Sequence, residues 1–406
     1  MRHLALIVAL LLLAGCREAP APPPAAKAPP DRESPEERVN LLNIGFGASV
    51  VSRTGELSLD NSALRAIDGN FDSPWNSPPD DPQQTLVFAL PAPASIEQFG
   101  IRTQPGIFAV REALIETSMD GSRFDALKMQ RFDASLELQI VPLQPPITAR
   151  YFRMTISPTP GLRFATLTSV QARGRFLETP SVPDLGGCWT VNGQAAALTN
   201  TGGTLERHIG EPIVLDGGRD GAVYRFAWAQ GPQWGHAIVT LSPDGRKLSA
   251  IKWHEEPIGY NYGESWFGER CGSGAWSAAD SAASRTKNPA ETAASPPTSA
   301  AGSAVLHAFL RRAGRYPLYG PDPVATVGAV LKRADRIRLV SRDFRGQNAQ
   351  ARLDALRVTL QEGGVDISRI DFGVAAEPHQ PIENAAMRAL YSAVEIEIPA
   401  AARSAF

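Results

Sequence analysis

The chain has 406 residues, of which 43% are hydrophobic, and its formal net charge is −2 at pH 7. This length exceeds what one small domain needs and predicts two or three domains. The near balance of acidic and basic residues, and the lack of a Lys/Arg-rich block in the sequence, argue against nucleic acid as a partner.

Near the start of the chain, Arg2 precedes an uncharged apolar run from Leu4 to Gly15, and Cys16 follows this run directly. This run is shorter than the roughly 20 residues of a membrane-spanning helix and is typical of a secretory signal peptide. The segment LAGC at 13–16 resembles the bacterial lipobox, and the resemblance implies cleavage before Cys16 and attachment of lipid to its thiol. Arg17, in place of an aspartate, then implies delivery to the outer membrane.

We therefore expect residues 1–16 to be a lipoprotein signal peptide. The mature protein would be held in the outer membrane by its lipid and would face the periplasm or the cell surface. The alternative is an ordinary signal peptide in which Cys16 occurs by chance.

Two segments have the composition of linkers. Residues 17–38 are rich in proline and alanine, which favours an extended chain, and residues 272–302 are rich in small residues and predict a flexible linker. They leave three blocks for folded domains, at 39–176, 181–271 and 303–400.

The first block alternates short β-rich runs with turn clusters about every ten residues, which predicts an antiparallel β-sandwich. Three of its segments, ALRAIDGNFDSPWNS (63–77), ETSMDGSRF (116–124) and PPITARYFRMTI (145–156), resemble the motifs of discoidin domains, also called coagulation factor V/VIII type C domains. That family includes the family 32 carbohydrate-binding modules. The resemblance implies a jelly-roll sandwich whose end loops bind ligands through aromatic side chains and a few polar neighbours.

On this resemblance, the candidate glycan-binding residues are Asn76, Arg102, Phe108 and Arg111. Neighbouring Trp75 is expected to be a buried structural residue. For Phe108, packing within its loop is an alternative to ligand binding.

Members of this family often hold a structural calcium ion in the Asp-Gly loop. Asp68, Asn70 and Ser73 offer oxygen ligands of the kind that calcium prefers, but Ser169 stands where the family has a closing glutamate. We therefore expect no required cofactor, with a structural calcium ion at these three residues as the alternative.

The second block reads as a small all-β domain, a meander or barrel. AIVTLSPDGRKLSAIKW (237–253) places a Pro-Asp-Gly turn between two β-rich runs. Cys188 precedes the first strand pattern and Cys271 follows the last, and a secreted protein lies in an oxidising compartment, so we predict a Cys188–Cys271 disulfide. The block contains five of the seven tryptophans: Trp189, Trp228, Trp234, Trp253 and Trp266.

The third block mixes strand and helix patterns, including a helix with Leu353, Leu356 and Leu360 on one face. The order of these patterns predicts an α+β domain with helices on one face of a mixed sheet. Residues 339–398 resemble the C-terminal domain of OmpA, which implies peptidoglycan binding. By that resemblance, Asp343 would bind the ammonium of diaminopimelate and Arg352 its carboxylate.

The third block also departs from the family pattern. The loop between Asp343 and Arg352 is shorter than usual, and Leu390-Tyr391-Ser392-Ala393 replaces the family's Asn-Arg-Arg. An ordinary ion pair at the start of a helix is therefore the alternative for Asp343 and Arg352.

Together these patterns predict a multidomain, non-enzymatic lipoprotein that binds envelope polysaccharide or peptidoglycan and tethers the cell envelope. No His-Glu-x-x-His or Gly-x-Ser-x-Gly motif of hydrolases occurs in the sequence. The alternative is an envelope scaffold whose modules have lost their sugar sites and bind other envelope proteins.

Overall fold

The computed structural model describes residues 39–81, 83–157, 164–207, 210–254, 263–272, 298–320, 322–343, 348–375 and 393–406. The predicted signal peptide with Cys16, the linker at 17–38, nearly all of 272–302 and residues 390–392 lie outside this part of the chain. Within it, no helix is both long enough and apolar enough to cross a membrane.

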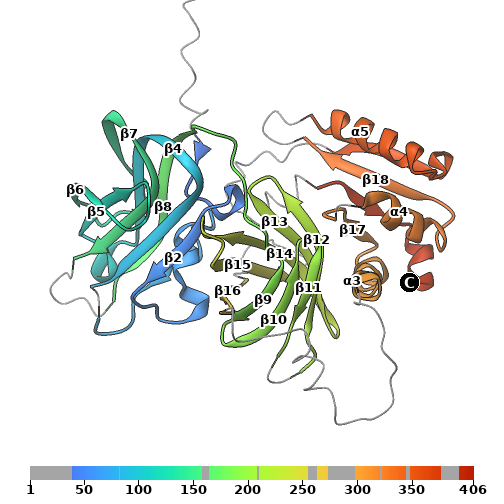
Figure 1. The fold of residues 1–406 in the computed structure, drawn as a ribbon, viewed down its shortest axis with the longest axis horizontal. Helices are drawn as coiled ribbons and strands as arrows, with labels where there is room; N and C mark the ends of the chain where they lie inside the picture. The colour runs from blue at the N-terminus through green and yellow to red at the C-terminus, as the bar shows by residue number, and fades with distance from the viewer. Residues whose placement is uncertain are drawn as a thin grey trace, which may run out of the picture. The chain divides into compact units, whose positions relative to one another are not determined.

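The first described part is an antiparallel β-sandwich (Figure 1). Its main sheet has the order β1-β8-β4-β7-β5-β6, while β2 pairs with β4 and β3 with β8. The long strands β4 and β7 carry alternating buried residues, and Trp75 is fully buried, as expected for a structural residue. The strands are β1 (Val39–Asn40), β2 (Ser49–Arg53), β3 (Trp75–Asn76), β4 (Thr85–Thr103), β5 (Glu112–Ser118), β6 (Asp125–Arg131), β7 (Gln139–Ile156) and β8 (Thr166–Phe176).

The second described part is a closed antiparallel barrel in which each strand pairs with the next and β16 pairs back with β9. Closure leaves no open sheet edge. A tight turn at Asn192 and Gly193, both with positive φ, joins the first two strands as in a two-residue hairpin. The strands are β9 (Gly187–Val191), β10 (Gln194–Thr199), β11 (Gly202–Leu205), β12 (Ile213–Asp220), β13 (Val223–Gln230), β14 (Gln233–Leu241), β15 (Lys247–His254) and β16 (Glu264–Arg270).

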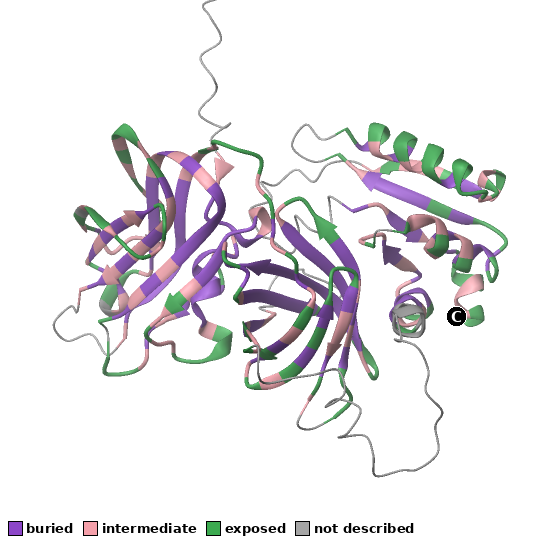
Figure 2. Ribbon diagram, viewed as in Figure 1, coloured by how far each residue is buried: buried purple, intermediate pink, exposed green. Residues whose placement is uncertain are grey.

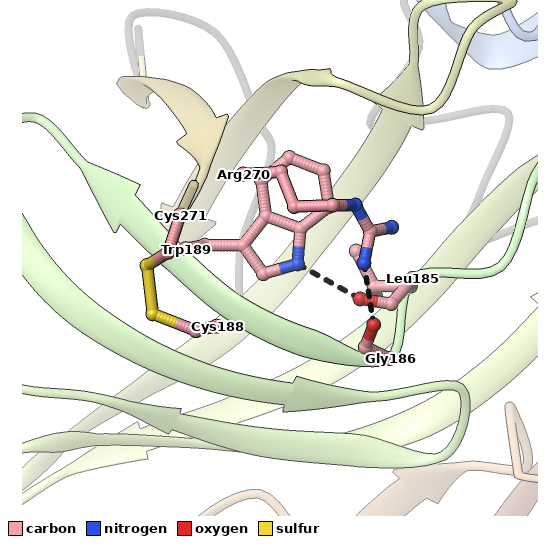
Figure 3. The surroundings of a disulfide bond; sticks show 6 residues. All are labelled: Leu185, Gly186, Cys188, Trp189, Arg270 and Cys271. Atoms are coloured by element: carbon pink, nitrogen blue, oxygen red, sulfur yellow. Dashed lines mark hydrogen bonds between the residues drawn. A yellow bond between two sulfur atoms is a disulfide. The ribbon is translucent and has the colours of Figure 1, made fainter. Parts of the chain in front are cut away.

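The predicted disulfide between Cys188 and Cys271 is confirmed and joins β9 to the end of β16 (Figure 3). Beside it, the indole Nε1 of Trp189 donates to the Leu185 carbonyl at 2.8 Å. The Arg270 guanidinium lies 4.5 Å from the centre of the Trp189 ring. Together they fill this end of the barrel.

Three neighbouring barrel strands, β13, β14 and β15, are buried on both faces rather than on one. β13 is buried from Val223 to Ala229 (Figure 2). The inward side chains of the barrel, such as Trp228, form one core. Outward side chains belong to two other cores: Ile238 packs with the sandwich, and Trp234 packs with the helical part that follows.

The third described part has a four-stranded mixed sheet of order β17-β20-β18-β19. β18 and β19 are parallel and are connected through α5, while the other pairs are antiparallel. Unlike the predicted order, a helix, α3, precedes the first strand, and it begins inside the range 272–302. The elements are α3 (Thr298–Arg312), β17 (Arg315–Pro317), α4 (Pro323–Leu331), β18 (Ile337–Arg342), α5 (Ala349–Glu362), β19 (Ile370–Ala375) and β20 (Glu395–Glu397).

The helix α5 forms where the leucine spacing predicts it. Leu353 and Leu360 are buried and Leu356 packs beside them. The Asn348 side chain accepts a hydrogen bond from the backbone N–H of Ala351 at 3.1 Å, which caps the first turn.

Candidate functional site

Of the four predicted glycan-binding residues, Asn76 contacts Thr166, the first residue of β8, and Arg102 and Phe108 each stand directly before a residue that contacts it. The Asn76 side-chain oxygen accepts a hydrogen bond from the Thr166 hydroxyl at 2.8 Å. Thr103, which follows Arg102, donates its hydroxyl to the Thr166 carbonyl at 2.9 Å, and Ala109, which follows Phe108, forms a backbone bridge with Thr166. Residues from three separate segments are thus placed at one end of the sandwich.

At this end of the sandwich, Arg102 packs against one phenylalanine and Phe108 packs against another. The guanidinium of Arg102 lies 4.5 Å from the centre of the Phe71 ring, and its Nε donates to the Leu136 carbonyl. The Phe108 ring stacks on Phe164 with the ring centres 4.7 Å apart and the planes 15° apart. All three phenylalanines are partly exposed.

We call the two pairs Phe71–Arg102 and Phe108–Phe164, taken together, the aromatic–arginine cluster. The sequence analysis missed Phe71 and Phe164. The sequence did offer a signal for Phe71. This residue follows the Asp-Gly motif in a turn, where no neighbouring strand or helix pattern provides packing for an apolar side chain.

Arg111 lies exposed directly before β5. Its carbonyl accepts a hydrogen bond from the backbone N–H of Phe132 at 2.8 Å, which fixes its main chain. The structure places it in the same loop as Phe108.

The three predicted calcium ligands do come together, but they bond to each other. Asp68 Oδ1 accepts from the backbone N–H of Asn70 at 2.7 Å, and Oδ2 accepts from the Ser73 hydroxyl at 3.0 Å. The Arg65 guanidinium lies 3.5 Å from the same Oδ2 and supplies the positive charge that a cation would bring. As arranged, these residues do not fit a calcium ion, because Arg65 would have to be displaced.

Burial raises the pKa of Asp68 to about 7, although the charge of Arg65 opposes this shift. The carboxyl is 4% exposed. No group of three or more His, Cys, Asp or Glu side chains within the described ranges is arranged to hold a metal ion.

The predicted peptidoglycan residues Asp343 and Arg352 both lie at the start of α5. Asp343 Oδ1 accepts from the backbone N–H of Ala349 at 2.8 Å. The Arg352 Nε donates to the Ser341 hydroxyl at 3.1 Å, and its guanidinium also donates to the Arg342 carbonyl. These bonds join the end of β18 to the first turn of α5.

Comparison with known proteins concerns the sandwich. Residues 48–167 match the family model of the F5/8 type C domain. No curated protein matches the chain. The discoidin resemblance is therefore confirmed as a fold for this part of the chain.

Several solved structures are similar to this part of the chain. The C-terminal domain of a chitobiase from Bacteroides fragilis is 19% identical, with a TM-score of 0.31, and the match covers 35% of this chain and 100% of that one. A family 32 carbohydrate-binding module from Clostridium perfringens, in complex with galactose, is 17% identical with a TM-score of 0.29, covering 34% and 98%. Another module from that organism, in complex with GalNAc-β-1,3-galactose, is 17% identical with a TM-score of 0.29, covering 33% and 99%.

Proposed function

We propose that this protein is a non-enzymatic lipoprotein of the outer membrane that binds glycan and tethers the cell envelope. The observation that carries glycan binding is the aromatic–arginine cluster at one end of a discoidin-type sandwich. Sugar rings present C–H groups that pack on aromatic faces, while their hydroxyls need a few fixed polar groups. Arg102 is a polar group that lies beside one such face, and Asn76 lies at the same end of the sandwich.

The tethering part of the proposal is a matter of effective concentration. A lipid on Cys16 would confine the protein to a surface, and a Pro/Ala-rich segment at 17–38 would extend from it. Weak sugar binding then suffices, because anchored modules meet their ligand at high local concentration.

A glycan array followed by affinity electrophoresis tests the binding. We expect Arg102→Ala and Phe108→Ala to weaken retention of the glycan that the array selects. Arg131→Ala is the matched control, because Arg131 is an exposed arginine of the same sandwich with an 89% exposed side chain. Equal binding by all variants would remove the cluster from the proposal.

The anchor has its own test. We expect mass spectrometry of the mature N-terminus to show acylated Cys16, and Cys16→Ser to release the protein from the membrane fraction. An unmodified thiol in a freely soluble periplasmic or secreted protein would contradict the anchor without touching glycan binding.

The alternative function, an envelope scaffold that binds other proteins, is favoured by one observation. The side chains of Asp343 and Arg352 bond to their own domain at the start of α5. Sedimentation with purified peptidoglycan sacculi separates the two. Loss of sedimentation in Arg352→Ala supports peptidoglycan binding, whereas no sedimentation of wild type or variant supports the scaffold.

A further inference from the structure

A cavity of about 680 Å³ lies where loops of the sandwich meet one mouth of the barrel. Its volume falls within the range typical of small-molecule sites, which often occupy the mouths of β-barrels. The opposite end of the barrel is filled by Trp189 and Arg270 next to the disulfide. The cavity therefore lies at the end of the barrel that these residues do not close.

The barrel brings charged groups into this mouth. Lys252 and Glu264 are directly paired residues of β15 and β16, with Nζ and Oε2 3.0 Å apart. The Lys252 side chain is only 6% exposed, and its ammonium lies 4.2 Å from the centre of the Trp228 ring. Even a paired buried charge contributes little net stability, because the cost of removing both ions from water offsets their attraction, so this ion pair calls for an explanation beyond stability.

Among the residues that the structure describes, the barrel side of the cavity carries one more positive than negative charge. Arg207 Nη1 lies 3.4 Å from Oε1 of Glu264, so two cations, Arg207 and Lys252, share one carboxylate. Burial alone would raise the pKa of Glu264, but the Lys252 ammonium and other donors hold it below its ordinary value. Glu264 is therefore ionised at neutral pH and cancels only one of the two positive charges.

The sandwich side of the cavity carries the opposite charge. Asp60 and Asp72 line it, and both are exposed. Neither carboxylate has a basic partner among the residues that the structure describes. The cavity thus has two carboxylates on its sandwich side and a surplus cation on its barrel side.

The two sides are held in place by buried bonds. The Ser62 hydroxyl donates to the Ser265 hydroxyl at 2.7 Å, and the Arg65 Nη2 donates to the Gly263 carbonyl at 2.6 Å. Both bonds join the sandwich to β16 or to the residue before it. A fixed separation of opposite charges is suited to a ligand that carries both charges itself.

We propose that this cavity binds a small zwitterion, namely a free α-amino acid or a short unblocked peptide. The ligand ammonium would lie toward Asp60 and Asp72, and its carboxylate toward Arg207 and Lys252, where a guanidinium offers a bidentate partner. The residues that line this cavity include none of the aromatic–arginine cluster, although Asp72 follows Phe71 in the chain, and the proposal does not depend on glycan binding.

Isothermal titration of the mature protein with alanine, lysine and alanyl-alanine tests the proposal. N-acetylalanine and alaninamide are the matched probes, because each lacks one of the two charges. We expect the zwitterions to bind and each blocked probe to bind at least about tenfold more weakly, since each loses a charge-assisted contact. Equal binding of blocked and free probes, or no binding of any zwitterion at millimolar concentration, would overturn the proposal.

Two exposed or half-exposed positions allow variants that keep the fold. Asp72→Asn should weaken binding of the free amino acid and of alaninamide, because both carry the ammonium. Arg207→Gln should instead weaken binding of N-acetylalanine, which carries only the carboxylate. Asp125→Asn and Arg131→Gln, which are exposed residues of the sandwich outside the cavity, should have no effect. Arg102→Ala distinguishes the two sites: loss of amino acid binding in that variant alone would assign the ligand to the aromatic–arginine cluster and refute the cavity.

Discussion

At the scale of single residues, Arg65 is a buried arginine on which three segments depend. It is 1% exposed, and its Nε donates to the Asp60 carbonyl at 3.1 Å while Nη2 donates to Gly263. Its third partner is the buried Asp68 carboxylate. The side chain therefore links the Asp-Gly loop to the barrel.

We expect Arg65→Met to lower the free energy of unfolding by roughly 3–5 kcal/mol at about pH 8, because it leaves a buried carboxylate without its cation. The penalty should shrink at about pH 5. The pKa of Asp68 is raised to about 7, so its carboxyl is then protonated and needs no counter-charge. Denaturant unfolding at the two pH values measures the difference.

The double variant Arg65→Met/Asp68→Asn is the control for this ion pair. It removes both charges and should recover part of the loss at about pH 8. If the single variant were equally unstable at both pH values, packing rather than charge would explain the role of Arg65.

The sequence places Asn76 in the motif at 63–77 and Arg102 and Phe108 between two motifs, and their role in glycan binding stays a prediction. It could not pair Arg102 with Phe71 or Phe108 with Phe164, since those contacts join segments that only the folded sheet brings together. For a similar reason, the sequence could not show that Asp68 bonds to Asn70, Ser73 and Arg65. Residue types suited to calcium are equally suited to a hydrogen-bonded turn that an arginine neutralises.

At the scale of elements, the disulfide closes the barrel where its first and last strands meet. Cys188 and Cys271 are separated by 83 positions, and the Cys271 N–H also donates to the Cys188 carbonyl at 3.1 Å. We expect Cys188→Ser/Cys271→Ser to lower the free energy of unfolding by about 4 kcal/mol, mainly because the unfolded chain regains the freedom that the cross-link removed.

Denaturant unfolding with and without reductant checks the value for the disulfide. Wild type under reducing conditions should behave like the double variant, while reductant should not affect the variant. A variant as stable as oxidised wild type would show that strand pairing alone closes the barrel.

His236 on β14 predicts a loss of stability in acid. Its ring is buried against Trp253, Phe309 and Tyr319, and burial, together with the charge of Arg315, lowers its pKa to about 3. In the unfolded chain the His236 ring takes up a proton near pH 6.5, whereas in the folded protein it stays neutral at that pH. The contribution of His236 is therefore complete above about pH 6.5 and decreases by about 1.4 kcal/mol per pH unit as the pH falls toward 3.

Replacing this histidine with a residue that cannot titrate should remove that dependence. Between about pH 6.5 and 4.5, His236→Gln should lose roughly 2–3 kcal/mol less than wild type in denaturant unfolding. His254→Gln, at an exposed histidine of the next strand, is the control and should lose nearly as much as wild type. Parallel pH profiles for wild type and His236→Gln would contradict the assignment.

Element types could be predicted where one periodicity was clear, as for α5 and the hairpin around Pro243 and Gly245. The barrel strands were harder, because their outward faces also pack and the expected alternation is lost along β13 and β14. The helix α3 was not predicted, and its first residues, 298–302, have the composition of a linker.

At the scale of the whole molecule, the described parts share cores rather than standing alone. Ile238, Ile251 and Trp253 of the barrel belong to the core of the sandwich. Side chains of α3, including Phe309, pack with Trp234 on another outward face of the barrel. The sequence predicts three blocks from their patterns, but a sequence pattern cannot show that one barrel completes the cores of two neighbours.

Shared cores predict that the sandwich and the barrel unfold together. Ile238 is fully buried and projects from the barrel into the core of the sandwich. Ile238→Ala should lower the free energy of unfolding by roughly 2–5 kcal/mol, and calorimetry should show one transition that moves as a whole.

Amide hydrogen exchange should then speed up in β2 and β4 of the sandwich as well as in β14, although the substitution lies in the barrel. Ile140→Ala, at an isoleucine of the sandwich that is 38% exposed, should leave both regions unchanged. Faster exchange confined to the barrel would mean that the two parts fold independently, and the cavity between them would then lack the fixed walls that a charge-separated ligand requires.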